Sequence, residues 1–570
     1  MKKNLYLFKN IYFGILIVFL NSCRSSDTEN TLIMNGASAV TFNLLGSEYG
    51  NSGDLSTQVS IGKVNILNKQ SHTVLVSPSN VITAELSPFV NDSKISTNAS
   101  LELSPVAAVS GNPLRSGVKF RVIAYRKSNG NYHTHKDYTV GQPVTPMMLD
   151  NGSPYDIVVY SFGTTSLPPI SAGEKTSISN AQVDYDNTNR DFMYQNIPYT
   201  PVSTVSNTLN IILRHKLAQI TTIVNVFGDG TIKSINSASL GDHYPSGKFS
   251  LSDGNISGRS AGVMSTEPIN FPSSGFPGKT QTANPVFLNS NTNGTNGGSF
   301  NADVNIVEGS TNTNTQGITK KINLNNIFKI TPENKSNLTI NLRTCSAYTG
   351  PSTIQGNLKL FMCYNLGANT SLDPFTPAAG IHGAKYQWGA NTGETGYYAS
   401  QSDDQTNSVI TGWVVVDKDK EKDNGSWSDV SKGTNDPCPA GYRVPTQSQW
   451  QSVIQNNNLE RIGTWGATAG VKYDTVLYII NDNKQRTLML PAAGYITDGS
   501  QSGGGGAGSV ASKDAVGYYW SSSTLYDSVS GKYLGYYLSF NETQPTRATY
   551  LNSTSRYDKN IGASVRCIQE

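Results

Sequence analysis

The chain has 570 residues, of which 15% are charged, and its formal net charge is +3. A charge this small, spread over that length without a basic cluster, excludes a nucleic-acid-binding surface. The length predicts about three or four domains. Many short alternating runs, separated by Gly, Ser, Thr and Asn, predict a mainly β protein.

Residues 1–22 are expected to be a lipoprotein signal peptide. A lysine-rich start precedes the apolar run IYFGILIVFL, which is too short to span a bilayer. The following LNSC resembles a bacterial lipobox, which implies that Cys23 becomes the lipid-carrying first residue; an ordinary signal peptide with an incidental cysteine is the alternative. Residues 23–34 form a polar tether, similar to those of surface-exported Bacteroidota lipoproteins. The expected location is the cell surface, anchored in the outer membrane by the lipid.

Strand-like runs fill residues 35–342. In VKFRVIAY, residues 118–125, alternation predicts a half-buried strand, and the Asn129-Gly130 pair signals a hairpin. Residues 289–316 are Asn/Thr/Gly/Ser-rich and are expected to form a long loop.

The order of these runs carries a resemblance. PLRSGVKFRVIAYRKSNGNYHTHKDYTVG, MMLDNGSPYDIVVYSF, RDFMYQNI and then LNIILRHKLAQITTIVNV resemble the fimbrillin family of Bacteroidota lipoproteins. The resemblance implies two transthyretin-like β-sandwiches, at residues 35–200 and 201–342. It also implies fimbrial subunits as partners.

Three histidines of this region are expected to be structural. His215 lies between Arg214 and Lys216 in a predicted strand, where a hydrogen-bonded role is expected. His133 and His135 alternate along a strand, which is the minimal spacing of a metal site, but no third ligand is in view. We expect two solvated surface histidines and no metal.

The last part of the chain contains four cysteines, Cys345, Cys363, Cys438 and Cys567. An even set in an exported chain predicts disulfides, and no CxxC pair supports zinc. The stretch GASVRCIQE predicts a final strand, so a Cys438–Cys567 bridge would tie that strand to the loop after Cys438. The Cys345–Cys363 pair follows by elimination and from the short loop between the two residues.

A short helix is predicted within CPAGYRVPTQSQW. Thr446 is a good N-cap and Gln449 follows three residues later, as in a capping box. Trp450, Val453 and Ile454 then share one face, which we expect to point inward.

Six motifs of the last domain are FMCYNLGAN, GIHGAKYQWGA, CPAGYRVPTQSQW, LMLPAAGYITDG, GYYWSSS and ASVRC. In this order they closely resemble the Fibrobacter succinogenes major paralogous domain. The resemblance implies that residues 343–570 form an α+β domain related to C-type lectins and to formylglycine-generating enzymes, on the cell surface. It implies no defined ligand.

No catalytic constellation is predicted in this domain. Its cysteines are better explained as disulfides than as the reactive pair of the formylglycine-generating relatives, and GYYWSSS lacks a G-x-S-x-G elbow. The lone histidine, His382, is expected to be structural. Gln544-Pro545-Thr546 matches the calcium-binding loop of C-type lectins only in part. No cofactor is predicted, although SLDPFTP and DKDKEKDNG contain acidic residues that calcium could use.

The predicted function is adhesion or binding by a surface lipoprotein, as a fimbrial tip, accessory subunit or stand-alone adhesin. Glycans or host surface proteins are the candidate ligands. Exposed aromatic residues are expected to bind them, with Tyr397, Trp413 and Trp427 as candidates and Trp388 in the core. The two alternatives are a surface enzyme that processes or modifies glycans, and a structural stalk or fimbrial shaft subunit.

Overall fold

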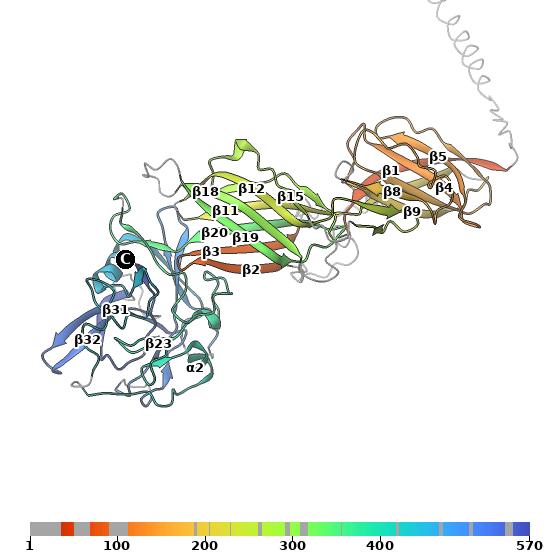
Figure 1. Ribbon diagram of the computed structural model, residues 1–570. Coiled ribbons are helices and arrows are strands. Elements are labelled where there is room, and N and C mark those ends of the chain that lie inside the picture. The colour runs from red at the N-terminus through yellow and green to blue at the C-terminus, as the bar shows by residue number, and fades with distance from the viewer. Residues whose placement is uncertain are drawn as a thin grey trace, which may run out of the picture. The chain divides into compact units, whose positions relative to one another are not determined.

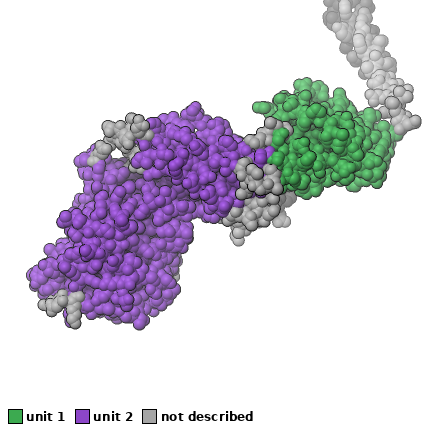
Figure 2. Space-filling model, viewed as in Figure 1, with its two compact units in different colours: residues 1–50, 101–216, 246–261 green, residues 51–100, 217–245, 262–570 purple. Residues whose placement is uncertain are grey.

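The computed structural model describes residues 36–50, 69–89, 112–186, 191–203, 206–228, 230–259, 265–290, 297–307, 317–354, 356–417, 421–466, 471–500, 505–541 and 551–570. The predicted signal peptide, the tether and Cys23 lie outside these residues, so lipidation stays a prediction. The protein is mainly β, as predicted, with several separate sheets. It divides into two compact units (Figure 2). Of the helices that the structure describes, none has the length and apolar character needed to cross a membrane.

The first unit takes its residues from the segments Met1–Gly50, Leu101–Lys216 and Ser246–Ala261. Its strands are β1 (Ala37–Glu48), β4 (Lys119–Arg126), β5 (Tyr132–Thr139), β6 (Met147–Asp150), β7 (Tyr155–Ser161), β8 (Gln182–Tyr185), β9 (Met193–Tyr199), β10 (Asn207–His215), β13 (Gly247–Ser250) and β14 (Ile256–Ser257). Seven of them form a sheet in the order β5-β4-β7-β9-β10-β1-β6, and the other three form a sheet in the order β14-β13-β8 (Figure 1).

Strand β4 is buried on both faces, although its alternation predicted a half-buried strand. The unexpected face contains Arg121, which is 3% exposed. Its guanidinium pairs with Asp137 at 2.6 Å and donates to the Tyr160 hydroxyl at 2.9 Å, while Glu174 lies 3.8 Å away. A charged residue in a strand can therefore be buried when the fold supplies its partners.

The second unit begins with a β-sandwich. Its elements are β2 (Gln70–Ser77), β3 (Asn80–Pro88), β11 (Ala218–Phe227), β12 (Thr231–His243), β15 (Ser265–Pro268), η3 (Ser273–Gly275), β16 (Thr280–Thr282), β17 (Val286–Leu288), β18 (Gly298–Val307), β19 (Ile318–Phe328) and β20 (Lys335–Thr344). One sheet has the order β16-β11-β20-β3-β2, with β17 also pairing with β11, and the other has the order β15-β12-β18-β19.

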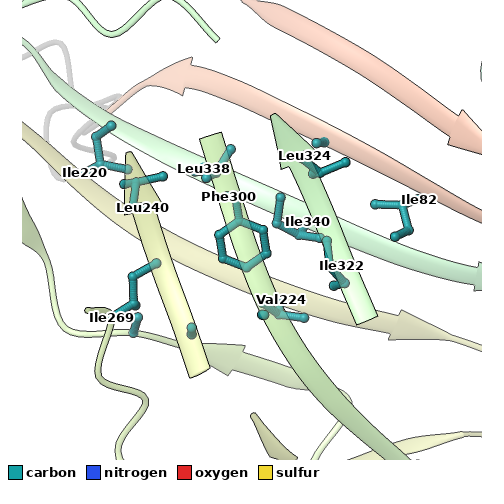
Figure 3. Packing of buried hydrophobic residues seen from close by; sticks show 14 of the residues in the cluster. Ile82, Ile220, Val224, Leu240, Ile269, Phe300, Ile322, Leu324, Leu338 and Ile340 are labelled. Atoms are coloured by element: carbon teal, nitrogen blue, oxygen red, sulfur yellow. The ribbon is translucent and has the colours of Figure 1, made fainter. Parts of the chain in front are cut away.

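The two sheets of this sandwich enclose one hydrophobic core. Burial alternates along the whole of β11 and β18, so each strand buries one face. Figure 3 shows Ile220 and Ile340 from one sheet packed with Leu240, Phe300 and Ile322 from the other. Strand β18 lies inside residues 289–316, so the expectation of a long loop there is wrong.

The chain passes between the two units more than once. Strand β3 pairs antiparallel with β20, with Asn80 opposite Thr344 at one end and Pro88 opposite Ser336 at the other. In sequence, however, β2 and β3 precede most of the first unit. Conversely, β13 and β14 follow β12 but belong to the first unit. The contiguous ranges 35–200 and 201–342 do not describe this interleaving, because pairing between distant segments leaves no local sequence signal.

Residues 345–570 complete the second unit, and we call them the C-terminal domain. Its elements are β21 (Ser346–Tyr348), β22 (Leu358–Leu360), η4 (Ala379–Ile381), β23 (Lys385–Tyr386), β24 (Tyr398–Ala399), α2 (Gln401–Thr406), β25 (Tyr442–Arg443), α3 (Gln447–Asn456), β26 (Asn458–Ile462), β27 (Val476–Ile480), β28 (Arg486–Pro491), β29 (Tyr495–Ile496), β30 (Val510–Ala511), β31 (Val516–Asp527), β32 (Lys532–Asn541), β33 (Leu551–Tyr557) and β34 (Ile568–Gln569). The larger sheets are β26-β27-β28 and β31-β32-β33.

Helix α3 begins as predicted. Thr446 is its N-cap, and the capping box with Gln449 is complete in both directions. Trp450 and Val453 are buried, which confirms the inward face of the helix.

The disulfides of the C-terminal domain join the predicted pairs, Cys345 with Cys363 and Cys438 with Cys567. The second pair is separated by 129 residues in sequence. Closing a loop of that length stabilises the folded state by roughly 5 kcal/mol in the chain-entropy model. This bridge ties the segment before α3 to the last strand.

The segment 561–568 runs through the middle of the C-terminal domain and is buried along its whole length. Its carbonyl groups accept hydrogen bonds from the backbone N–H groups of Met362, Leu366, Tyr386 and Trp520. These four donors come from well-separated parts of the sequence. The last segment therefore connects parts of the domain that are far apart in sequence.

Arg566 of this segment is 1% exposed. Its guanidinium donates twice to the Asn365 side-chain oxygen, at 3.0 and 2.8 Å. It also donates to the carbonyl oxygens of Met362, Cys363 and Met489, at 3.1, 3.0 and 2.9 Å. All of these acceptors are neutral, and burial lowers the pKa of Arg566 to about 10.

We predict that Arg566→Met lowers the free energy of unfolding by roughly 3 kcal/mol or more, because each buried acceptor left without a donor costs roughly 1–3 kcal/mol. Denaturant unfolding of the full chain measures this. Arg556→Met, at an exposed arginine of the same domain, is the control and should change stability by less than about 0.5 kcal/mol. Equal stability of both variants would contradict the role given to Arg566.

Candidate functional site

Two of the three aromatic residues expected to bind a ligand are buried. Trp413 and Trp427 are 7% and 0% exposed, so the prediction that they are exposed is wrong. The Trp413 indole donates to the carbonyl of Asn560 at 3.0 Å, and that of Trp427 donates to the carbonyl of Asn435 at 3.2 Å. Trp388 is fully buried, as predicted, with its ring 5.4 Å from that of Trp427.

The two buried tryptophans anchor the ends of a polar loop, residues 414–426. At its beginning, the Asn560 side chain accepts from the Val416 N–H at 3.2 Å and donates to the Val416 carbonyl at 3.0 Å. At its end, the Ser426 N–H donates to the carbonyl of Asp423 at 2.9 Å. Because both ends are fixed, the described part of the loop presents Lys422 in a defined position.

Tyr397, the third candidate, is half-buried and lies against this loop. The Lys422 ammonium is 4.6 Å from the centre of its ring and also pairs with Glu394. Gly389 permits this approach: its φ is +83°, and a Cβ there would lie 2.8 Å from the Lys422 Cβ. The structure thus places Tyr397 at a surface with a lysine.

Lys559 is 3% exposed and lies beneath this surface, where it connects the surface to strand β32. Its ammonium donates to the Lys422 carbonyl at 2.9 Å and to the Asn424 side chain at 2.6 Å. It lies 4.4 Å from the centre of a Trp388 ring and 5.8 Å from that of Tyr533. Burial lowers the pKa of Lys559, and the carboxylates nearest to it, Glu421 first, oppose this shift.

The β31–β32 hairpin adds exposed aromatic residues. Tyr526 and Tyr533 are cross-strand neighbours, 53% and 43% exposed, with ring centres 5.2 Å apart. Beside them Lys532 pairs with Asp558 at 2.8 Å. Figure 1 shows this hairpin at the outer edge of the C-terminal domain. We call the surface of Tyr397, Lys422, Tyr533 and Tyr526, with the buried Lys559 beneath it, the aromatic face.

The sequence analysis missed Tyr526 and Tyr533. They are placed symmetrically about the four residues 528–531 in YDSVSGKY, whose Ser530-Gly531 pair is a hairpin signal. That signal predicts cross-strand pairing of the two tyrosines. It does not show that the pair lies outside the core.

Glu421 adds a carboxyl group close to the charges of this face. Burial, followed by the negative charge of Asp558, raises its pKa. Its Oε1 has no hydrogen-bond partner within the described ranges. This oxygen is buried, so it lies beneath the face and is not exposed to a bound ligand.

A cavity elsewhere in the second unit is too small for such a ligand. It lies where strands β3, β11 and β20 meet β22, and its volume is about 50 Å³. A single water needs roughly 10–15 Å³ by this measure, so the cavity holds only a few waters.

An arrangement of the kind that hydrolases use occurs in the first unit. His215 lies 2.6 Å from Asp191 through Nδ1 and 3.0 Å from the Ser47 hydroxyl through Nε2. A nucleophile must also be reachable by substrate. Ser47 is buried, and the ring of Tyr49 stacks on His215 at 4.0 Å. The geometry gives His215 the hydrogen-bonded structural role that the sequence predicted.

His133 and His135 both lie on β5 and are half-buried rather than freely solvated. Their Nδ1 atoms lie 3.2 Å from the Arg126 guanidinium and 2.7 Å from the Tyr132 hydroxyl. Burial lowers the pKa of both rings. Among the residues described, no group of three or more His, Cys, Asp or Glu side chains is placed to hold a metal ion.

No protein-family model matches the chain, and no curated protein sequence matches it. Solved structures are similar to part of it. A fimbrial assembly protein from Parabacteroides distasonis is 10% identical, over 43% of this chain and 86% of its own, with a TM-score of 0.23. A proposed cell adhesion protein from Bacteroides uniformis is 11% identical, over 40% and 86%, with a TM-score of 0.25. Another, from Bacteroides fragilis, is 12% identical, over 53% and 93%, with a TM-score of 0.26.

We predict that Trp427→Ala destabilises the protein by roughly 3–5 kcal/mol, the usual cost of truncating a buried large aromatic residue. Tyr397→Ala, which removes a half-buried ring from the surface, should cost less than half as much. Thermal unfolding of the two variants beside the wild type measures the difference. A Trp427→Ala protein that unfolds at the wild-type temperature would contradict the anchoring role.

Proposed function

We propose that the protein is a cell-surface adhesin whose C-terminal domain binds a glycan at the aromatic face. The observation that carries the proposal is the exposed Tyr526–Tyr533 pair, which the buried Lys559 connects to Lys422 and Tyr397. Exposed aromatic residues that adjoin polar groups suit a binding surface better than a purely structural one.

The chemistry of this face fits a polyhydroxylated ligand. The tyrosine rings offer flat apolar surfaces to the C–H faces of sugar rings, and each ring has few rotatable bonds to immobilise. The Lys532–Asp558 pair offers donors and acceptors to hydroxyl groups. Pairing of β32 with both β31 and β33 holds the hairpin in place, which limits the entropy lost on binding.

The proposal includes the outer-membrane anchor at Cys23, on the strength of the lipobox-like motif, and fimbrial subunits as partners. A tip, accessory or stand-alone subunit is favoured over a shaft subunit. Residues 561–568 are hydrogen-bonded within their own domain, and Cys567 is bridged to Cys438. This segment is therefore not free to pair with a neighbouring subunit.

We predict that the double variant Tyr526→Ala/Tyr533→Ala binds glycans roughly 5- to 150-fold more weakly, since two aromatic contacts of about 0.5–1.5 kcal/mol each are lost. A glycan array with the full chain identifies the ligand, and titration measures its affinity. Phe89→Ala removes an exposed aromatic residue from the β-sandwich and should leave binding unchanged.

Thermal unfolding of the wild type, the double variant and Phe89→Ala is the control, and it should show that the three proteins are equally folded before their binding is compared. Full glycan binding by the double variant would contradict the assignment of the aromatic face. Failure of the wild type to bind any glycan, together with binding to host surface proteins, would replace the glycan by a protein ligand.

A further inference from the structure

Lys385 and Asp404 form a buried pair in the C-terminal domain that the aromatic face does not include. Both side chains are 0% exposed, and the Lys385 Nζ lies 3.4 Å from the Asp404 Oδ1. Lys385 belongs to β23 and Asp404 to α2, so the contact joins two elements. Enclosing two charges without water is costly unless good hydrogen bonds compensate.

The hydrogen bonds of this pair are incomplete. Neither the Lys385 Nζ nor the Asp404 Oδ1 has a hydrogen-bond partner among the described residues, although the two atoms touch. The other carboxylate oxygen, Oδ2, accepts from the Gln405 side chain at 2.9 Å and lies 3.4 Å from the Lys513 Nζ. One oxygen is therefore held by two donors, and the other faces the Lys385 nitrogen.

Cationic groups outnumber the carboxylate in this pocket of the core. Lys385 and Lys513 both adjoin Asp404. His382 is buried nearby and interacts electrostatically with both lysines. Burial lowers the pKa of Lys385, and burial followed by the two lysines lowers that of His382 well below its usual range. Burial thus makes the uncharged amine of Lys385, which is a nucleophile, easier to form than in solvent.

We propose that Lys385 and Asp404 are joined by an intramolecular isopeptide bond. The Lys385 Nζ attacks the Asp404 Cγ, a new C–N bond forms, and the Cγ–Oδ1 bond breaks. Starting from ammonium and carboxylate, two protons of the nitrogen leave with Oδ1 as one water molecule and the third stays on the amide. Atoms and charge balance without any co-reactant.

The surroundings favour this reaction. The Lys385 Nζ lies 3.4 Å from Oδ1, which is bonded to the Cγ that it attacks, so the amine is held next to the carboxyl group. Lys513 and Gln405 lie at Oδ2, where negative charge develops in the tetrahedral intermediate, and they stabilise it. The product replaces two buried charges by a neutral amide, which removes their desolvation cost. Lys513 keeps the Asp404 main-chain carbonyl as an acceptor.

The bond would close the loop 386–403, which contains Glu394 and Tyr397 of the surface described above. It would fix the base of that loop to helix α2, whose capping box with Ser400 and Asp403 already defines its start. The inference does not depend on the proposed glycan binding, since it concerns only the covalent state of the chain.

We predict that the reduced and denatured chain is lighter by one water than the mass expected for its sequence after removal of residues 1–22 and lipidation of Cys23. Trypsin should not cleave after Lys385, and the peptides with Lys385 and Asp404 should appear as one cross-linked species. The Lys385→Met chain, prepared identically, should have the full mass. Asp404→Asn should form the same bond with loss of ammonia instead of water.

Three results would overturn the proposal: separate, unmodified peptides from the wild type, a mass deficit that persists in Lys385→Met, or a cross-link at another residue. If Lys385→Met does not fold, the peptide map of the wild type still decides the question, because it requires no variant.

Discussion

The hydrogen bonds of Arg566 are the constraint on which the C-terminal domain depends. This domain consists largely of loops and very short strands, so many backbone carbonyl groups have no partner in a regular sheet. A buried guanidinium presents five N–H donors in one plane, which suits several acceptors from different segments. Arg566 donates to the carbonyl groups of Met362, Cys363 and Met489 in this way. Asn365, which accepts from Arg566, donates in turn to the His382 carbonyl and the Tyr519 hydroxyl.

The aromatic face is held by the same interior. The Trp520 N–H donates to the Ser564 carbonyl at 3.0 Å, and the Trp520 indole donates to the carbonyl of Tyr386 at 2.7 Å. Gly535 of β32 packs directly on these rings: a Cβ there would lie 2.8 Å from Trp388 and from Trp520. The hairpin with Tyr526 and Tyr533 therefore rests on tryptophans that the last segment positions. A surface supported in this way is arranged before a ligand arrives.

Local chemistry explains which parts of this structure could be predicted from the sequence. A capping box and the alternation of a strand both depend on residues that are close in sequence. The capping box that the sequence predicted at Thr446 and Gln449 is accordingly present in the structure. The alternation of Phe300, Ala302, Val304 and Ile306 was equally local, but the polar composition around it concealed strand β18. The pairing of four cysteines had few alternatives.

Other features depend on the fold as a whole and left little local signal. Trp413 and Trp427 flank a charged loop, and this position predicted that both side chains are exposed. Instead, the Trp413 indole donates to the carbonyl of Asn560 and the Trp427 indole to that of Asn435. A tryptophan beside a polar loop can be the anchor that holds the loop in place. Likewise, Arg566 and Lys385 have the composition of surface residues, and only the three-dimensional arrangement of their neighbours explains their burial.

Backbone hydrogen exchange of the full chain tests most directly whether Arg566 and the last segment hold the domain together. The amides of Met362, Leu366 and Tyr386 donate to this segment, so they should exchange only through global unfolding of the domain and be among its slowest. The amide of Val430, a residue that is 93% exposed, donates to the Ser428 hydroxyl in an exposed turn and should exchange much faster. Exchange of the three amides at the rate of Val430 would show that the last segment opens independently, and the account of a preorganised binding domain would fail.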